Sequence, residues 1–109
     1  MKNIVLINPR TSASRLPNKE KYAAREPLGI LAVGSFLQHY GYKISIIDTN
    51  LYPEDEVKEK LKLFVNSETI FIGLSVMTAQ VPHALELSGY LKESGTTSSI
   101  VWGGIHPTL

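Results

Sequence analysis

Four short apolar runs divide the chain, and each is rich in β-branched or aromatic residues with little polar alternation. They cover residues 2–8, 42–48, 69–74 and 100–102. Continuous apolar runs of this length are typical of strands that are buried on both faces of a parallel sheet. The third run leads into Ser75, at the carboxyl end of a central strand, which is where open α/β sheets bind their ligands.

Helical patterns fill the intervals between these runs. The first, over residues 28–40, is apolar on nearly every face, which predicts burial on more than one side. The second begins at Glu54 and carries a single apolar stripe, so we expect it to be half solvated. The third spans residues 79–94, with Thr78 as its expected N-cap. Its expected inward-facing residues are Val81, Ala84, Leu85, Ser88 and Leu91.

The regular alternation of strand and helix predicts an α/β fold, with right-handed crossovers and helices on both faces of a parallel sheet. We expect a flavodoxin-like (Rossmann-like) doubly wound sheet with strand order 2-1-3-4, in which the loops after Asn8, Leu74 and Trp102 meet at one rim. Sheets of this type normally have a fifth strand and a last helix. We therefore expect residues 1–109 to be a truncated N-terminal piece of a longer protein. The fourth strand would then be an exposed edge, which invites dimerisation.

The composition excludes several classes of function for this chain. The chain has 109 residues, which suits one domain, and its net charge of +1 gives no reason to expect a nucleic acid partner. The absence of cysteine excludes a disulfide scaffold, a thiolate metal site and a cysteine nucleophile within this chain. Neither a leader sequence nor an apolar run long enough to span a membrane is present, so a cytoplasmic location is the default expectation.

A long segment without apolar periodicity, residues 10–26, follows the first strand and carries an excess of basic side chains. Such loops are functional or disordered in compact domains. One interpretation is a flap over a ligand that bears negative or carboxamide groups, and the other is a solvated loop.

The glycines at the end of the fourth strand are a weaker signal. Gly103 and Gly104 permit close approach of a flat ligand to the backbone, although a plain turn also explains such a pair. Neither a dinucleotide-binding fingerprint nor a phosphate-binding loop that ends in Lys-Ser or Lys-Thr is present. The acidic cluster of a receiver domain is also missing, since the first strand ends in Asn8-Pro9.

Five segments, in order and at consistent spacing, together resemble the N-terminal cobalamin (vitamin B12)-binding domain of radical S-adenosylmethionine (SAM) enzymes. They are Leu6-Ile7-Asn8-Pro9, Glu26-Pro27-Leu28-Gly29-Ile30-Leu31, Ile47-Asp48-Thr49-Asn50, Gly73-Leu74-Ser75-Val76-Met77-Thr78 and Val101-Trp102-Gly103-Gly104-Ile105-His106-Pro107-Thr108.

The resemblance implies a role for each of these loops. The nucleotide tail of cobalamin would descend between the sheet and its helices, and the corrin ring would lie over the carboxyl ends of the strands. Residues expected beside the tail are Ser75, Val76, Met77, Thr78, Gly103 and Gly104. The rim would be completed by His106 and Pro107, and residues of the first loop that would approach the corrin are Asn8, Pro9 and Arg10.

One departure from the family pattern concerns cobalt. Classical cobalamin domains carry Asp-x-His-x-x-Gly after the second strand, and the histidine ligates cobalt. Here Asp48 is retained, Asn50 stands at the histidine position and Pro53 replaces the glycine. An amide is a poor cobalt ligand compared with imidazole, so bound cobalamin is expected to have neither its own base nor a histidine beneath the metal. Some members with this domain bind no cobalamin, which leaves a vestigial domain as an alternative.

The other candidate side chains have structural alternatives. We expect His39 to be a surface residue at a helix C-terminus, His83 to be partly exposed and structural, and Trp102 to pack on a strand. His106 is a better site candidate, although a structural hydrogen bond is favoured over cobalt ligation. Asp48 either accepts a hydrogen bond from a ligand amide or caps the next loop.

The leading hypothesis is a cobalamin-binding module without catalytic or metal-ligating residues of its own. By resemblance, the iron–sulfur cluster and S-adenosylmethionine would belong to a radical SAM catalytic domain further along the same polypeptide, and the parent enzyme would transfer methyl groups or rearrange a ring. The alternative is an interaction module that packs against that catalytic domain without cobalamin. A flavin or nucleotide binder on the same fold is a third reading.

Overall fold

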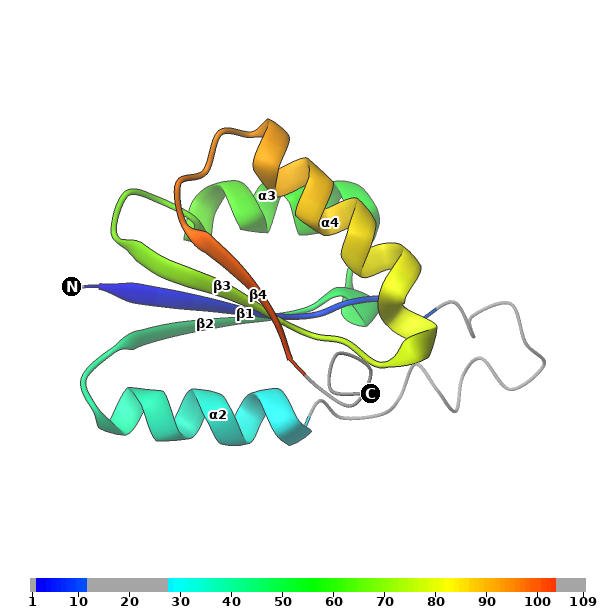
Figure 1. Ribbon diagram of the computed structural model, residues 1–109. Helices are drawn as coiled ribbons and strands as arrows, with labels where there is room; N and C mark the ends of the chain where they lie inside the picture. The colour runs from blue at the N-terminus through cyan, green and yellow to red at the C-terminus, as the bar shows by residue number, and fades with distance from the viewer. Residues whose placement is uncertain (1, 12–27, 104–109) are drawn as a thin grey trace.

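The computed structural model describes residues 2–11 and 28–103. Its centre is a four-stranded parallel sheet with the order β2-β1-β3-β4 (Figure 1). The strands are β1 (Asn3–Asn8), β2 (Lys43–Asp48), β3 (Thr69–Ser75) and β4 (Ser99–Gly103). The predicted flavodoxin-like topology is confirmed, and the point at which the strand order reverses lies between β1 and β3.

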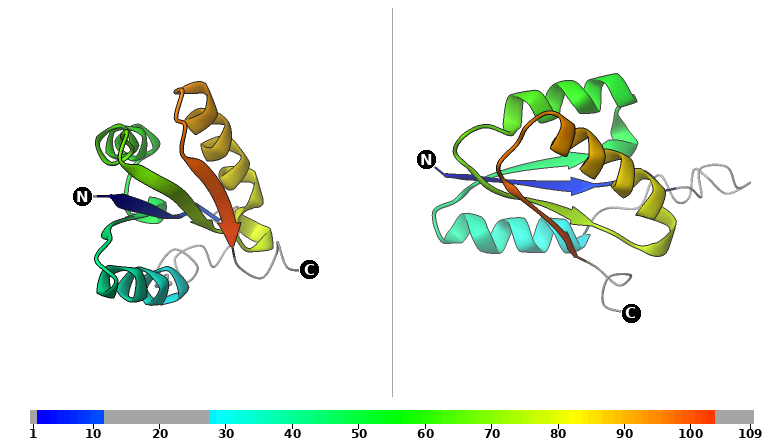
Figure 2. Two further views of the ribbon diagram at one scale, coloured as in Figure 1. Left: turned by 60° about the vertical axis from the view of Figure 1, so that its left-hand side comes forward. Right: turned by 45° about the horizontal axis from the view of Figure 1, so that its top comes forward.

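Three α-helices cover the sheet from both sides. Helix α2 (Leu28–His39) lies on one face, while α3 (Glu54–Phe64) and α4 (Val81–Glu93) lie together on the other (Figures 1 and 2). Short 3₁₀ turns, η2 (Thr49–Leu51) and η3 (Thr78–Gln80), follow β2 and β3. The described helices are too short or too polar to cross a membrane.

The main core lies between the sheet and the α3–α4 pair. Every residue of β1 is buried, as expected for a central strand that is covered on both faces. Along β1 and β3, alternate residues point to this core and the intervening ones to α2. The buried residues of the main core are Val5, Ile7, Ile47, Val57, Leu61, Ile72, Leu74, Val76, Ala84, Leu87 and Leu91.

The second core, beneath α2, is small. It consists of Ile4, Leu6 and Ile30, with partly buried neighbours around them. A Cβ atom added at Gly34 would lie 3.2 Å from Ile46 Cδ1, so this glycine lets α2 pack closely over β2. Within the described residues only the side of α2 that faces the sheet is buried, because Leu31, Val33, Phe36 and Tyr40, the last just after the helix end, are exposed. Burial of a second side, against another domain, stays a prediction.

The start of α4 differs from the prediction. The helix begins at Val81, after the 3₁₀ turn η3, and Gln80 occupies the N-cap position without a side-chain capping bond. The expected cap, Thr78, is instead the first residue of η3. The Gln80 side chain makes tertiary hydrogen bonds in place of a cap, which local sequence patterns do not indicate.

The inward face of α4 also differs. Leu85 is 60% exposed, whereas Leu87 is only 1% exposed and belongs to the main core. Ala84, Leu87 and Leu91 recur at three- and four-residue spacing and so share one face of the helix. Leu85 follows Ala84 directly and is rotated by about 100° from it, away from that face.

Candidate functional site

The carboxyl ends of β1, β2, β3 and β4 lie along one edge of the parallel sheet, here called the rim, as the topology predicts. Asn8 faces Asp48 in the register of β1 and β2, and Ser75 faces Gly103 in the register of β3 and β4. The backbone N–H of Val76 donates a 2.7 Å hydrogen bond to the carbonyl oxygen of Gly103. The expected convergence of Ser75 and Gly103 is therefore confirmed.

A pocket of about 280 Å³ opens between α2 and the part of the sheet formed by β3 and β4, close to this rim. Its walls are mostly apolar, and its residues from α2 lie across from those of the strands. The lining residues are Leu6, Gly29, Ile30, Val33, Phe71, Gly73, Leu74, Ser75, Val101 and Gly103.

The glycines determine how closely a bound ligand can approach the pocket walls. A Cβ atom added at Gly29 or Gly103 would meet no atom within 4 Å, so both backbones face open space. At Gly73 an added Cβ would lie 3.0 Å from Leu6 Cδ2, so this position is already filled by the protein. An elongated ligand can therefore lie directly against the backbone at Gly103 and Gly29.

Asp48 has a capping role. Its Oδ1 accepts hydrogen bonds from the Asn50 backbone N–H (3.1 Å), from Asn50 Nδ2 (3.0 Å) and from Asn8 Nδ2 (3.2 Å). Asp48 is thus the N-cap of η2, and the capping interpretation is confirmed. The Asn50 amide, at the position where classical members carry histidine, is hydrogen-bonded to this carboxylate.

Gln80 connects two of the rim loops, a role that was not predicted from the sequence. Its Nε2 donates to Asn8 Oδ1 and to the carbonyl oxygen of Pro9, each at 2.8 Å, and its Oε1 accepts from the Met77 backbone N–H at 2.9 Å. A side chain at a helix start, one turn after a strand, is the only sequence signal that marks it. Together with Asp48, it ties the ends of three strands into one hydrogen-bonded rim.

Arg10 lies against the start of α3. Its guanidinium group is 2.8 Å from Glu54 Oε2 and donates to the carbonyl oxygens of Thr49 (3.0 Å) and Tyr52 (2.9 Å). Because these contacts occupy the guanidinium group, the part of Arg10 that could approach a corrin is its backbone. This approach stays a prediction.

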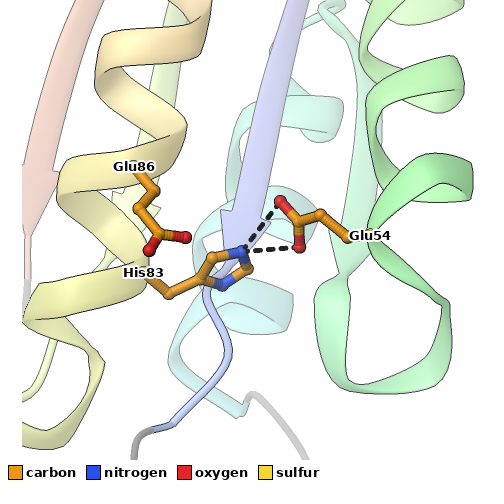
Figure 3. A group of neighbouring side chains, drawn as sticks. All are labelled: Glu54, His83 and Glu86. Atoms are coloured by element: carbon orange, nitrogen blue, oxygen red, sulfur yellow. Dashed lines mark hydrogen bonds and ion pairs between the residues drawn. The ribbon is translucent and has the colours of Figure 1, made fainter.

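His83 is buried, with 7% of its surface exposed, so the expectation of a partly exposed residue is wrong. Its Nδ1 accepts a 2.6 Å hydrogen bond from the Arg10 backbone N–H, and its Nε2 lies 3.1 Å from Glu54 Oε2 (Figure 3). Burial lowers the pKa of His83 below its usual value, although the Glu54 carboxylate acts in the opposite direction. Neutral His83 with its proton on Nε2 satisfies both contacts.

Glu54, His83 and Glu86 bring three potential metal ligands within 4.8 Å of one another (Figure 3). A cation bound at Nε2 would require the ring proton on Nδ1, where it would oppose the Arg10 N–H. The Arg10 guanidinium group also occupies Glu54 Oε2 and repels a cation. Burial raises the pKa of the Glu54 carboxyl, but the hydrogen bond and the charge of Arg10 act against this, and the net effect lowers that pKa. The contacts among Arg10, Glu54 and His83 therefore do not favour a bound cation.

The remaining predicted site residues are placed as follows. Val76 lies in the main core, Pro9 is fully buried and Met77 is exposed beside η3. The strand packing predicted for Trp102 is confirmed, because it packs on the main core and its Nε1 donates to Ser88 Oγ at 3.0 Å. His39 is exposed at the end of α2, as expected. Gly104, His106, Pro107 and the residues of the basic loop after Thr11 lie outside the described residues, as does the side chain of Thr78.

Comparison with known proteins agrees with this geometry. Residues 23–109 match the family model described as "B12 binding domain". A curated relative, the "Anaerobic magnesium-protoporphyrin IX monomethyl ester cyclase" of Synechocystis sp., is 29% identical over an alignment of 109 positions. That alignment covers 96% of this chain but 21% of the cyclase, so the chain spans about a fifth of the length of its relative. No solved structure matches the chain significantly. Because the family model covers most of the chain and the fold has the expected strand order, the chain belongs to the family of B12-binding domains.

Proposed function

We propose that residues 1–109 form the cobalamin-binding module of a radical SAM enzyme. The observation that carries this proposal is the pocket between α2 and the β3–β4 part of the sheet, with Ser75 and Gly103 at its rim end. Its apolar walls and the open backbones at Gly29 and Gly103 suit the elongated nucleotide tail of cobalamin. The corrin would lie above the carboxyl ends of the strands.

Several residues would hold the cofactor in this arrangement. Ser75 offers a hydroxyl group at the end of β3, Gly103 offers open backbone, and the loop from Asn8 to Thr11 would face the corrin. Asn50, whose amide is bonded to Asp48, stands where classical members carry histidine, so this loop would offer cobalt no imidazole ligand. Bound cobalamin would supply organometallic chemistry at cobalt, and this chain would bind and orient it.

The catalytic step would take place in a separate domain of the same polypeptide. An iron–sulfur cluster needs cysteine ligands, and this chain has none. Its curated relative is named as a cyclase and is about five times longer than the aligned region. A parent enzyme that carries out ring formation or methyl transfer with S-adenosylmethionine fits both facts.

A titration with hydroxocobalamin tests the proposal. The purified chain is mixed with cobalamin, and binding is followed by the corrin absorbance and by retention of the cofactor on gel filtration. Saturable binding at micromolar cobalamin is expected, and flavin mononucleotide is not expected to compete. Tighter binding of the flavin would favour a flavin or nucleotide binder, and no binding at high micromolar cobalamin would refute the module.

The exposed apolar side of α2 favours a second function, that of an interaction module. Phe36 and Tyr40 form this surface, and their rings lie 5.0 Å apart. An exposed apolar helix surface is typical of a domain interface, here with the catalytic domain of the parent enzyme. In this case Phe36→Ser would weaken association with that domain and would leave cobalamin binding unchanged.

A further inference from the structure

We propose that His83 is a positioning residue, which fixes the loop after β1 by accepting a hydrogen bond from the backbone N–H of Arg10. The inference rests on the proposed function, since it assigns that loop to the corrin side of the rim. His83 itself is buried in α4 and would not touch the cofactor.

The contacts of His83 make it the central link between three segments. Its Nδ1 is 2.6 Å from the Arg10 nitrogen in the loop after β1, and its Nε2 is 3.1 Å from Glu54 Oε2 at the start of α3. Glu54 in turn holds the Arg10 side chain at 2.8 Å. The loop is therefore held through its backbone by α4 and through its side chain by α3.

The hydrogen bond from Arg10 requires a free lone pair on Nδ1. A second proton on the ring would be added at that nitrogen, because Nε2 already carries the proton that faces Glu54. The imidazolium would then oppose its N–H to the N–H of Arg10, and the loop would have to move. The attachment is therefore present only with neutral His83.

Charged groups from each neighbouring element act on this equilibrium. Glu54 on α3 and Glu86 on α4 favour the imidazolium, whereas burial and the guanidinium group of Arg10 disfavour it. The net effect lowers the pKa of His83, so the hydrogen bond between Arg10 N–H and His83 Nδ1 persists at neutral pH and is lost as the solution is acidified.

Two amide variants separate the hydrogen bond from simple packing. In His83→Asn the side-chain oxygen can occupy the position of Nδ1, and it accepts a hydrogen bond without titrating. In His83→Gln the amide reaches toward the position of Nε2 and leaves the Arg10 N–H without its acceptor. His83→Phe keeps a buried ring and removes both nitrogens.

The experiment measures amide hydrogen exchange at Arg10 and cyanocobalamin affinity between pH 7.5 and pH 5.5 in the full chain. At pH 7.5 we expect His83→Asn to resemble the unsubstituted chain. In His83→Gln and His83→Phe we expect the Arg10 amide to lose its protection from exchange and the cyanocobalamin affinity to fall about tenfold. On acidification the unsubstituted chain should lose affinity relative to His83→Asn, whose amide oxygen does not titrate. Because other histidines and the cofactor titrate equally in both chains, the difference between the two reports the titration of His83 alone.

Two results would overturn the inference. One is unchanged protection of the Arg10 amide in a folded His83→Phe variant, with folding verified by circular dichroism. The other is an identical pH dependence of Arg10 exchange for the parent chain and His83→Asn. If the parent chain bound no cobalamin, the proposed function would fail, while exchange at Arg10 would still decide whether His83 holds the loop.

Discussion

Ser75 and Gly103 occupy the same register position on adjacent parallel strands, and the next backbone N–H, that of Val76, donates to the carbonyl oxygen of Gly103 at 2.7 Å. This pairing brings a hydroxyl group and a backbone without a side chain to one end of the pocket beneath α2. The two residues are far apart in the sequence, and the parallel pairing of β3 and β4 makes them neighbours.

Gly103→Val is expected to weaken cobalamin binding at least about tenfold without unfolding the chain. The added side chain meets no protein atom within 4 Å at its Cβ and lies at the pocket wall, so it occupies space that the cofactor tail would use. Quenching of the fluorescence of Trp102, the only tryptophan, provides the measurement. Gly89→Val is the matched control, because Gly89 is exposed on α4 and an added Cβ there also meets nothing within 4 Å. Equal affinity of the two variants would contradict the assignment of the pocket.

Asn50→His is expected to place an imidazole beneath the cobalt of bound cobalamin. In the parent chain the Asn50 amide is a poor cobalt ligand and is bonded to Asp48, whereas imidazole is a good one. The absorbance and electron paramagnetic resonance spectra of bound cob(II)alamin would shift to those of a nitrogen-ligated form. Asn50→Gln is the control. A spectrum of Asn50→His identical to that of the parent chain would show that the loop after β2 does not lie beneath the cobalt.

Leu87→Ala is expected to destabilise the fold by about 2–5 kcal/mol, whereas Leu85→Ala should change the free energy of unfolding by less than about 0.5 kcal/mol. Leu87 is buried in the main core, and the truncation leaves a cavity there, while the side chain of Leu85 is mostly in solvent. Urea unfolding followed by circular dichroism gives both values. A larger loss for Leu85→Ala than for Leu87→Ala would mean that α4 presents a different face to the sheet.

Stability is expected to fall on acidification in two ranges of pH. His83 has a lowered pKa in the fold, so the unfolded chain takes up its proton first and stability decreases as the pH falls below about 6.5. Glu54 also has a lowered pKa in the fold, so its contribution is present above about pH 4.5 and is lost as the pH falls further.

The variants His83→Asn and Glu54→Gln separate the two ranges. The first should flatten the pH dependence that begins below about pH 6.5, and the second should flatten the one that begins below about pH 4.5. Because the Arg10–Glu54 pair is about one-third exposed, Glu54→Gln is expected to cost no more than about 1 kcal/mol at pH 7. The measurement is the urea midpoint of unfolding at each pH. If His83→Asn had the same pH dependence of stability as the unsubstituted chain, the assignment of the higher pH range to His83 would be contradicted.

The sequence alone determined the strand order and the location of the rim. Apolar runs without polar alternation identify strands covered on both faces, and handedness then leaves few ways to connect them. The capping role of Asp48 and the packing of Trp102 could also be predicted from the sequence, since both depend on residue type and on position in a helix or strand. The family resemblance, carried by the five rim segments, was confirmed by the match to B12-binding domains.

The tertiary structure alone decided which side chains hold the rim in place. Gln80 was assigned to a helix that it only precedes, and His83 was expected to be partly exposed, because their partners Asn8 and Arg10 are more than seventy positions away. Packing of α4 in the main core likewise decided that Leu87 and not Leu85 is buried. Local patterns specify strands and helices through backbone geometry, whereas contacts between distant loops exist only after the sheet has brought strand ends together.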